Sequence, residues 1–141
     1  MPLTDAFVAD RTTVAAISDS TVPVRDLAAV DVKGVDIVKL GKLRSILADK
    51  PFTTVLPEFP EVHAVSDDGP WIFEISPALI ASLAQMKTPE AVEFAKRWAT
   101  IQEFQLDGFD LSAGTSVLQQ FVLLAQQAQT QAKGVYLWSS L

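Results

Sequence analysis

Twenty-two consecutive residues between Asp110 and Lys133 carry no charge, and six of them are Gln. A helix that faces water usually marks its wet side with charged residues. Half of the stretch is Gln, Ser, Thr or Gly, which argues against a membrane span although the length would suffice. The stretch therefore predicts a helix over 115–132 that is shielded from water on most of its sides.

The apolar residues of this helix follow a helical period. At about 100° per residue, one stripe contains Val117, Phe121, Leu124, Ala128 and Ala132, and three more residues widen it: Leu118, Val122 and Ala125. Leu123 falls on the far side, where the glutamines lie. Neutral amides cost less to bury than charges, provided that they are hydrogen-bonded.

Two arrangements satisfy this pattern. In the first, the helix is the central element of the fold, with its glutamines at wet ends and edges. In the second, the far side meets a protein partner or a second copy of the chain, because interface centres are depleted of charge. The residues of that interface would be Gln119, Gln120, Leu123 and Gln127. The sequence leaves both arrangements open, and the second predicts a homodimer.

The totals describe a globular chain. The 141 residues suit a single domain over 1–141, with 49% hydrophobic and 20% charged residues. The chain has no cysteine, which excludes disulfides and thiolate ligands and fits a reducing compartment. The first residues lack the basic and apolar regions of a secretory signal, so we expect a soluble cytoplasmic protein. The net charge of −6 argues against nucleic-acid binding.

Charge is distributed unevenly along the chain. Residues 33–50 hold five bases against two acids, whereas residues 51–86 hold five acids and no base. The acids are Glu58, Glu61, Asp67, Asp68 and Glu74. For the basic segment we favour a solvated helix face, paired in part with the acidic segment, over a phosphate grip formed by Lys39 and Lys42. The acidic segment 58–74 is a candidate surface for a basic protein partner.

Local signals predict an α+β fold in which about four main helices pack on a small, mostly antiparallel sheet. Strands are expected in the hairpin 61–76, which turns at the sequence SDDGP, at 135–139, and once or twice within 3–25. A helix is expected over 35–51, capped by Asp36 and ended by Pro51.

Two further helices are expected to begin with the same pair of residue types. Ser76 and Thr88 would be N-caps, each followed by a proline at the first helical position. Gly134 is expected to end the neutral helix. The segments that we expect to be irregular are 18–21, 52–62 and 106–114, and 25–31 is expected to form a short helical turn.

Catalytic signals are sparse. The one histidine, His63, would have to serve as the base of any serine hydrolase, but no G-x-S-x-G motif is present. On a hairpin strand we expect His63 to face outward, opposite Val62 and Ala64. Neither a P-loop nor a metal-binding motif appears, so we expect no cofactor and no metal site.

Two pairs of acids and two tryptophans are the remaining candidates. Asp67 and Asp68 lie in the predicted turn, where such residues usually cap their own backbone. Asp107 and Asp110 are close enough in sequence for acid–base chemistry, but helix capping is the interpretation that we favour. Trp71 and Trp138 lie on predicted strands, where packing against helices is favoured over a ligand pocket.

Two classes of function stay open. The first is a non-enzymatic binding protein that uses the acidic segment 58–74, as some toxin-neutralising and adaptor proteins of similar composition do. The second is a small-molecule binder or enzyme with a pocket between sheet and helices, formed by His63, Asp107, Asp110 and the two tryptophans. The lack of a catalytic motif favours the first class.

Overall fold

A five-stranded antiparallel sheet organises the computed structural model, which describes residues 3–17 and 27–140. In sheet order the strands are β2 (Val30–Asp31), β1 (Leu3–Ala9), β5 (Gly134–Ser140), β4 (Trp71–Glu74) and β3 (Glu61–Ala64). The predicted hairpin and C-terminal strand are confirmed. The C-terminal strand joins the hairpin at the middle of the sheet, where β5 also pairs with β1 along its whole length, from Leu3 opposite Ser140 to Ala9 opposite Gly134.

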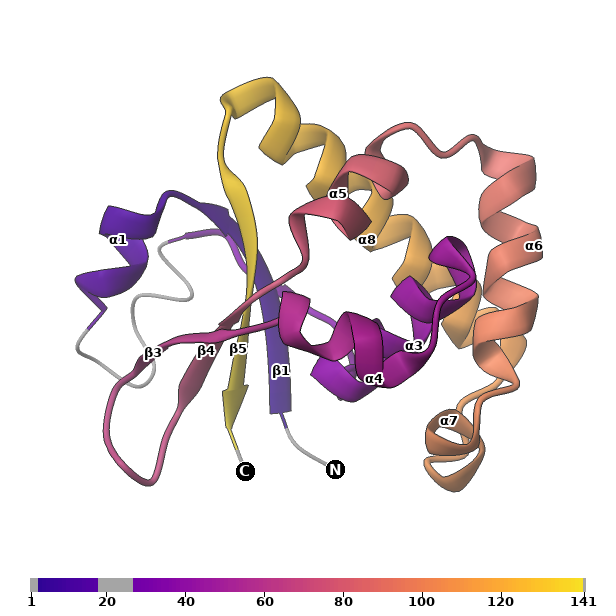
Figure 1. The fold of residues 1–141 in the computed structure, drawn as a ribbon, viewed down its shortest axis with the longest axis horizontal. Coiled ribbons are helices and arrows are strands. Elements are labelled where there is room, and N and C mark those ends of the chain that lie inside the picture. The colour runs from indigo at the N-terminus through magenta and orange to yellow at the C-terminus, as the bar shows by residue number, and fades with distance from the viewer. Residues whose placement is uncertain (1–2, 18–26, 141) are drawn as a thin grey trace.

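The helices lie mainly on one side of this sheet (Figure 1). They are α1 (Arg11–Ala15), α3 (Ile37–Ala48), α4 (Phe52–Val55), the 3₁₀ helix η1 (Leu56–Glu58), α5 (Pro77–Ala84), α6 (Thr88–Ala99), α7 (Gln102–Leu106) and α8 (Leu111–Gln131). Among the described residues, α3, α5, α6 and α8 have eight residues or more. The predicted α+β class with about four main helices is therefore confirmed.

Each face of the sheet has its own apolar cluster, because successive side chains of a strand point to opposite faces. The larger cluster joins Ala6 and Leu137 of the sheet to Leu118 and Phe121 of α8 and to residues of α3, α5 and α6. The smaller cluster contains Phe7 and Tyr136, with Val14 and Ile17 in and after α1. The sheet is thus covered on both sides, by four long helices on one face and by α1 on the other.

Two of the three predicted N-caps form as expected. Asp36 accepts a hydrogen bond from the backbone N of Lys39 at 3.0 Å, and Ser76 accepts one from the N of Leu79 at 3.2 Å. The third cap, predicted at Thr88, lies one residue earlier. Lys87 is the N-cap, and Thr88 is the first helical residue. The shift is tolerated because proline suits either of the first two helical positions, where no N–H donor is needed.

Other predicted boundaries were wrong. The segment 52–62 is not irregular throughout, since α4 and η1 occupy most of it. Residues 102–106 and 111 onward are helical, which shortens the predicted loop at 106–114. The cap of α8 is Ala132, which adopts the left-handed conformation with φ 54°, and Gly134 instead begins β5. Of the helical turn predicted at 25–31, residues 30–31 instead form the strand β2, whereas residues 25–26 and the predicted loop at 18–21 lie outside the described residues.

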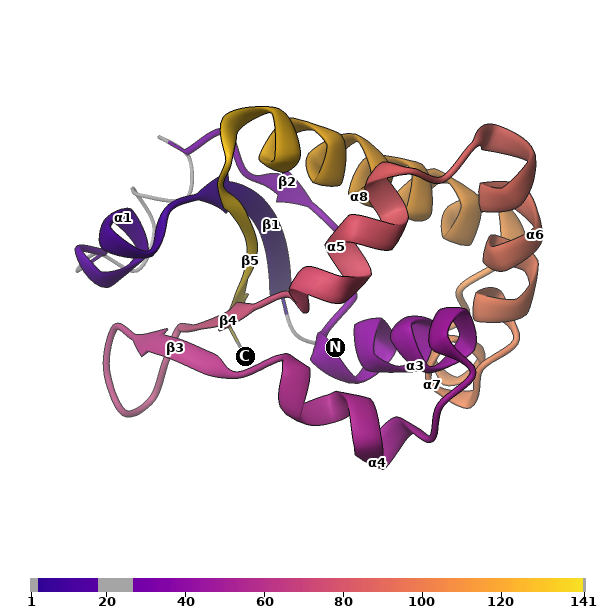
Figure 2. The same cartoon turned by 45° about the horizontal axis from the view of Figure 1, so that its top comes forward.

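The neutral helix α8 buries one face and leaves the other open. Its predicted stripe is confirmed at Val117, Phe121, Leu124 and Ala128, but Ala132 is exposed at the C-cap. Figure 2 shows α8 along the top of the helical layer, beside α5 and above β1. Leu123, on the opposite side, is 66% exposed. The prediction that this helix is shielded on most sides is therefore wrong for a single copy.

The composition of the neutral stretch predicts that it does not span a membrane. Although α8 has 21 residues, no helix within 3–17 and 27–140 combines the length and the hydropathy needed to cross a bilayer.

Candidate interaction surfaces

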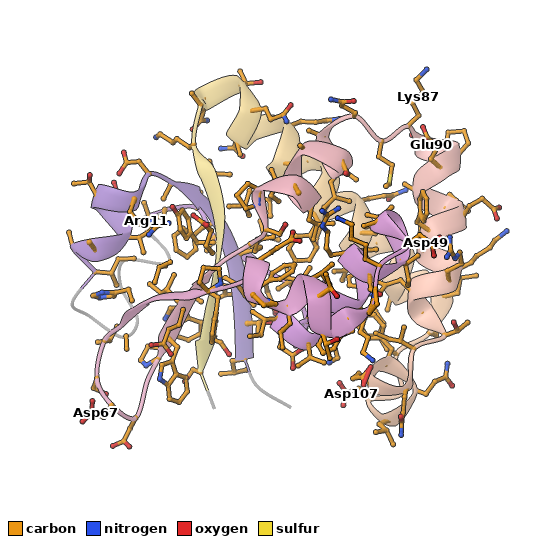
Figure 3. All side chains as sticks on the ribbon, viewed as in Figure 1. Arg11, Asp49, Asp67, Lys87, Glu90 and Asp107 are labelled. Atoms are coloured by element: carbon orange, nitrogen blue, oxygen red, sulfur yellow. The ribbon has the colours of Figure 1, made fainter. Side chains whose placement is uncertain are left out.

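The candidate residues for a pocket do not meet in one place. Asp67 lies on the loop of the β3–β4 hairpin, and Asp107 lies after α7 at the other end of the molecule (Figure 3). The two acidic pairs therefore lie in separate parts of the fold and have different contacts.

His63 is half buried and faces α1. It pairs with Ile72 across the hairpin, and its Nε2 contacts the carbonyl oxygen of Ile17. The expected outward orientation was wrong for two reasons. A bulge between Glu61 and His63 shifts the alternation of the strand, and the face that receives the ring is covered by the segment around α1. The described residues give His63 no carboxylate partner.

Asp107 forms an ion pair with Lys39, which is only 3% exposed. The ammonium also donates to the carbonyl oxygen of Gly34 at 2.9 Å and lies 5.4 Å from the centre of the Phe104 ring. The expectation of a solvated Lys39 was therefore wrong. A buried ammonium requires a counter-charge and acceptors, and Asp107 supplies that charge from a loop far along the chain.

Asp110 caps α8. Its carboxylate accepts a hydrogen bond from the backbone N of Ala113 at 2.8 Å, which is the capping role favoured from the sequence. Asp107 and Asp110 thus have different structural partners, and neither is held beside a histidine or a second acid by any described hydrogen bond.

The two strand tryptophans lie on opposite faces of the sheet. Trp71 pairs with Ser139, whereas Trp138 pairs with Ile72, so their side chains alternate. Both rings are half buried, and Trp138 contributes to the packing around α1. Its Nε1 is buried and has no hydrogen-bond partner within the part of the chain that the structure describes. The two rings therefore do not share a pocket.

Two of the five acids in 58–74 are paired within the chain. Glu58 accepts from the hydroxyl of Ser76 at 2.6 Å and from the Nε of Arg44 at 3.0 Å, and these bonds, Ser76 first, lower the pKa of its carboxyl. Glu74 accepts from Arg11 at 2.8 Å. The Arg44 contact confirms the predicted pairing between the basic and acidic segments. The remaining acids, Glu61, Asp67 and Asp68, are exposed and form no ion pair among the described residues.

The open face of α8 is the other candidate surface. Between residues 116 and 130, the positions within about 60° of Leu123 around the helix axis are Ser116, Gln119, Gln120, Leu123, Gln126, Gln127 and Thr130. All are exposed except Gln120, which is half buried and whose Oε1 lacks a hydrogen-bond partner in the described structure. Leu123 is thus an exposed apolar side chain at the centre of an uncharged surface.

A groove of about 350 Å³ runs beside Leu123. Its lining residues are Met86, Thr88 and Ala91 on one wall, and Gln119, Val122, Leu123 and Gln126 on the other. Sequence reasoning missed Met86, Thr88 and Ala91, because nothing local in their segment indicates that it lies against α8, and it assigned Val122 to the buried stripe instead of to a groove. A second depression, of about 200 Å³, lies between α5 and the end of α8. Neither is lined by a residue of the predicted pocket.

Within the described residues, no three potential metal ligands among His, Cys, Asp and Glu cluster. No family model matches this chain, and comparisons with curated proteins and with solved structures found no significant match.

Proposed function

We propose that this chain is a non-enzymatic binding protein, which self-associates through the open face of α8 and meets a basic protein partner with its acidic hairpin. The observation that carries the proposal is the exposure of Leu123 at the centre of a helix face without charge. A single exposed leucine is ordinary on a protein surface. Here it lies in an uncharged face beside a groove, which is the composition of an interface centre.

The contacts of the candidate catalytic residues support a binding role over an enzymatic one. Asp107 neutralises Lys39, Asp110 caps α8, and the Nε2 of His63 contacts the carbonyl oxygen of Ile17. Each side chain thus has a structural task. These tasks lie in different parts of the fold, so the three residues do not form a shared reaction site.

The hairpin supports the second half of the proposal. Glu61, Asp67 and Asp68 are exposed, and the described structure supplies no base to neutralise them. The hairpin loop lies far from α8 in Figure 1, so both surfaces can be occupied at once. Toxin-neutralising and adaptor proteins are the classes that we propose by analogy of composition. The proposed compartment is the cytoplasm, since the cysteine-free chain is compatible with reducing conditions.

A pull-down with charge-matched baits tests the hairpin. The bait Asp67→Asn/Asp68→Asn is compared with the control Asp49→Asn/Glu93→Gln, which removes the same two negative charges from exposed positions elsewhere. Asn suits both the turn and the left-handed Asp49, so neither bait is expected to unfold.

We expect the wild type and the control to retain the same protein, which rising salt releases and which the hairpin variant fails to retain. Retention by the hairpin variant equal to that of the control would overturn the acidic hairpin as the binding surface. It would leave self-association through α8 untouched.

A further inference from the structure

Between residues 116 and 130, the open face of α8 carries similar side chains at equal distances before and after Leu123. Moving outward from this residue, the face presents Gln120 and Gln126, then Gln119 and Gln127, then the hydroxyl residues Ser116 and Thr130. Each pair lies at equal distances before and after Leu123. A helix whose outer surface is symmetric in this way can pack against a copy that runs in the opposite direction.

Such antiparallel packing would place amide side chains of one copy opposite amide side chains of the other. With a two-fold axis at Leu123, Gln119 faces Gln127 of the partner subunit, and Gln120 faces Gln126 of the partner subunit. A primary amide both donates and accepts, so each of these pairs can form hydrogen bonds. The same antiparallel direction also places opposite ends of the two helix dipoles together.

The groove borders this face beside Leu123. Its α8 wall consists of Gln119, Val122, Leu123 and Gln126, which follow the spacing i, i+3, i+4 and i+7. These four neighbours on one helix surface form one wall of the groove, and Met86, Thr88 and Ala91 form the opposite wall, so the groove is open to a side chain of a facing helix. Along α8, the middle of this wall lies between residues 122 and 123. In the antiparallel arrangement, the residue that comes over it is the partner subunit's Leu123.

The absence of charge on α8 favours a second copy of the chain as the molecule that covers this face. From residue 111 to residue 132 the helix offers no ionised group, so a strongly charged partner would bury its charges there without a counter-charge. The face of a second copy carries the same amides and the same leucine, and therefore buries none. The uncharged α8 wall of the groove fits this occupant.

The geometry points to a two-fold homodimer in which the α8 helices cross antiparallel at Leu123 and each Leu123 sits in the groove of the other copy. This arrangement rests on the proposed self-association and adds its axis, direction and residue pairs. An isologous contact of this kind closes on itself, so the assembly stops at two copies.

Cysteine cross-linking tests the arrangement sharply, because the chain has no cysteine of its own. At the axis, two helices whose axes are about 10 Å apart bring their facing Cα atoms to about 5 Å, within the range of a disulfide. Leu123→Cys is therefore expected to form a covalent dimer on mild oxidation. Gln129→Cys is the matched control, since Gln129 is exposed on the same helix about 120° away from Leu123.

The direction of the helices is tested by mixing two variants. Gln119→Cys and Gln127→Cys, one of them carrying a tag, are expected to cross-link mainly to each other and several-fold less to themselves. Cross-linking of Gln119→Cys to itself as efficiently as to Gln127→Cys would overturn the antiparallel axis. So would efficient linkage through Gln129→Cys without linkage through Leu123→Cys.

Light scattering of the wild type separates this failure from a failure of the proposed function. A dimer with the wrong cross-linking pattern overturns the arrangement alone. A monomer at tens of micromolar overturns self-association as well. Thermal unfolding of each variant is expected to match the wild type, because all four positions are exposed in one copy.

Discussion

The indole Nε1 of Trp98 donates a hydrogen bond to the carbonyl oxygen of Lys39 at 2.8 Å. The bond joins α6 to α3 at the residue whose ammonium is neutralised by Asp107. Phe104 of α7 packs edge-on against the same indole, with 4.8 Å between the ring centres. Three helices are therefore tied together around one buried cation. The helix α6, which provides part of the groove wall, is held in place by these contacts.

Loss of the counter-charge is expected to destabilise this junction. Asp107→Asn leaves the buried Lys39 ammonium without its counter-charge, and only neutral acceptors such as the Gly34 carbonyl remain. Breaking a fully buried pair costs more than breaking an exposed one, and the Asp107 side chain is 27% exposed. We expect a loss of about 2 kcal/mol in the free energy of unfolding, measured by urea denaturation.

The double variant Lys39→Met/Asp107→Asn serves as the control for this prediction. Methionine keeps much of the apolar stem of lysine and removes the charge, so part of the lost stability is expected to return. Equal stability of Asp107→Asn and the wild type would show that the ion pair contributes nothing to folding.

The paired Glu58 predicts a dependence on acid. Its folded pKa lies below the ordinary value of 4.5, because Ser76 and Arg44 hydrogen-bond to the charged form. The stability that it contributes is therefore complete above that ordinary value and is lost as the pH falls through the lower folded pKa. Glu58→Gln is expected to be less stable than the wild type by about 1 kcal/mol at neutral pH.

The difference between these two proteins is expected to shrink as the pH falls from 4.5 through the lower folded pKa of Glu58, where Glu58 becomes protonated in the folded state too. Urea denaturation at a series of pH values measures it. Glu93→Gln is the control, because Glu93 contacts Lys96 at the exposed surface and contributes little. A difference that stays constant as the pH falls below 4.5 would contradict the assignment.

Close packing at Gly41 predicts that Gly41→Ala lowers the stability of the wild type but raises the stability of the variant Phe52→Ala. A Cβ at this position would lie 2.7 Å from Cε2 of Phe52, whose ring also receives the ammonium of Lys42 at 4.7 Å. Gly41→Ala is expected to destabilise the wild type by about 1 kcal/mol, since the ring must move. In the background Phe52→Ala the same change should stabilise by about 0.5–1 kcal/mol, because alanine favours a helix interior.

Thermal and urea unfolding of the four proteins completes this cycle. If Gly41→Ala stabilised both proteins by a similar amount, the Phe52 ring would move aside without loss of stability. Packing against this ring would then not explain the glycine at position 41.

The elements of this fold were predictable where their signals are local. Asp36, Ser76 and the hairpin turn act within a few residues, and all three were placed correctly. Lys39 was misplaced because its counter-charge lies 68 residues away and no local pattern announces it. His63 was misplaced because a one-residue bulge inverts the alternation on which the prediction depended.

The candidate surface was predictable only in part. The neutral stretch identified Leu123 and its glutamines, since charge is visible in the sequence. The sequence did not show which side of the helix is covered, because burial by the rest of the fold and burial by another copy require the same composition. The wall formed by Met86, Thr88 and Ala91 depends on how α6 packs against α8, which is a tertiary property.

Light scattering coupled to size exclusion, over a concentration series, measures self-association through α8. Two leucine variants are compared with the wild type: Leu123→Lys on the open face and Leu106→Lys on α7, where the leucine is 78% exposed. We predict a mass of two chains at tens of micromolar for the wild type and for Leu106→Lys. Leu123→Lys, which places two like charges together at the axis, should weaken the dimer by about 100-fold or more. A wild type with the mass of one chain, or a dimer that Leu123→Lys leaves intact, would contradict self-association through the open face of α8.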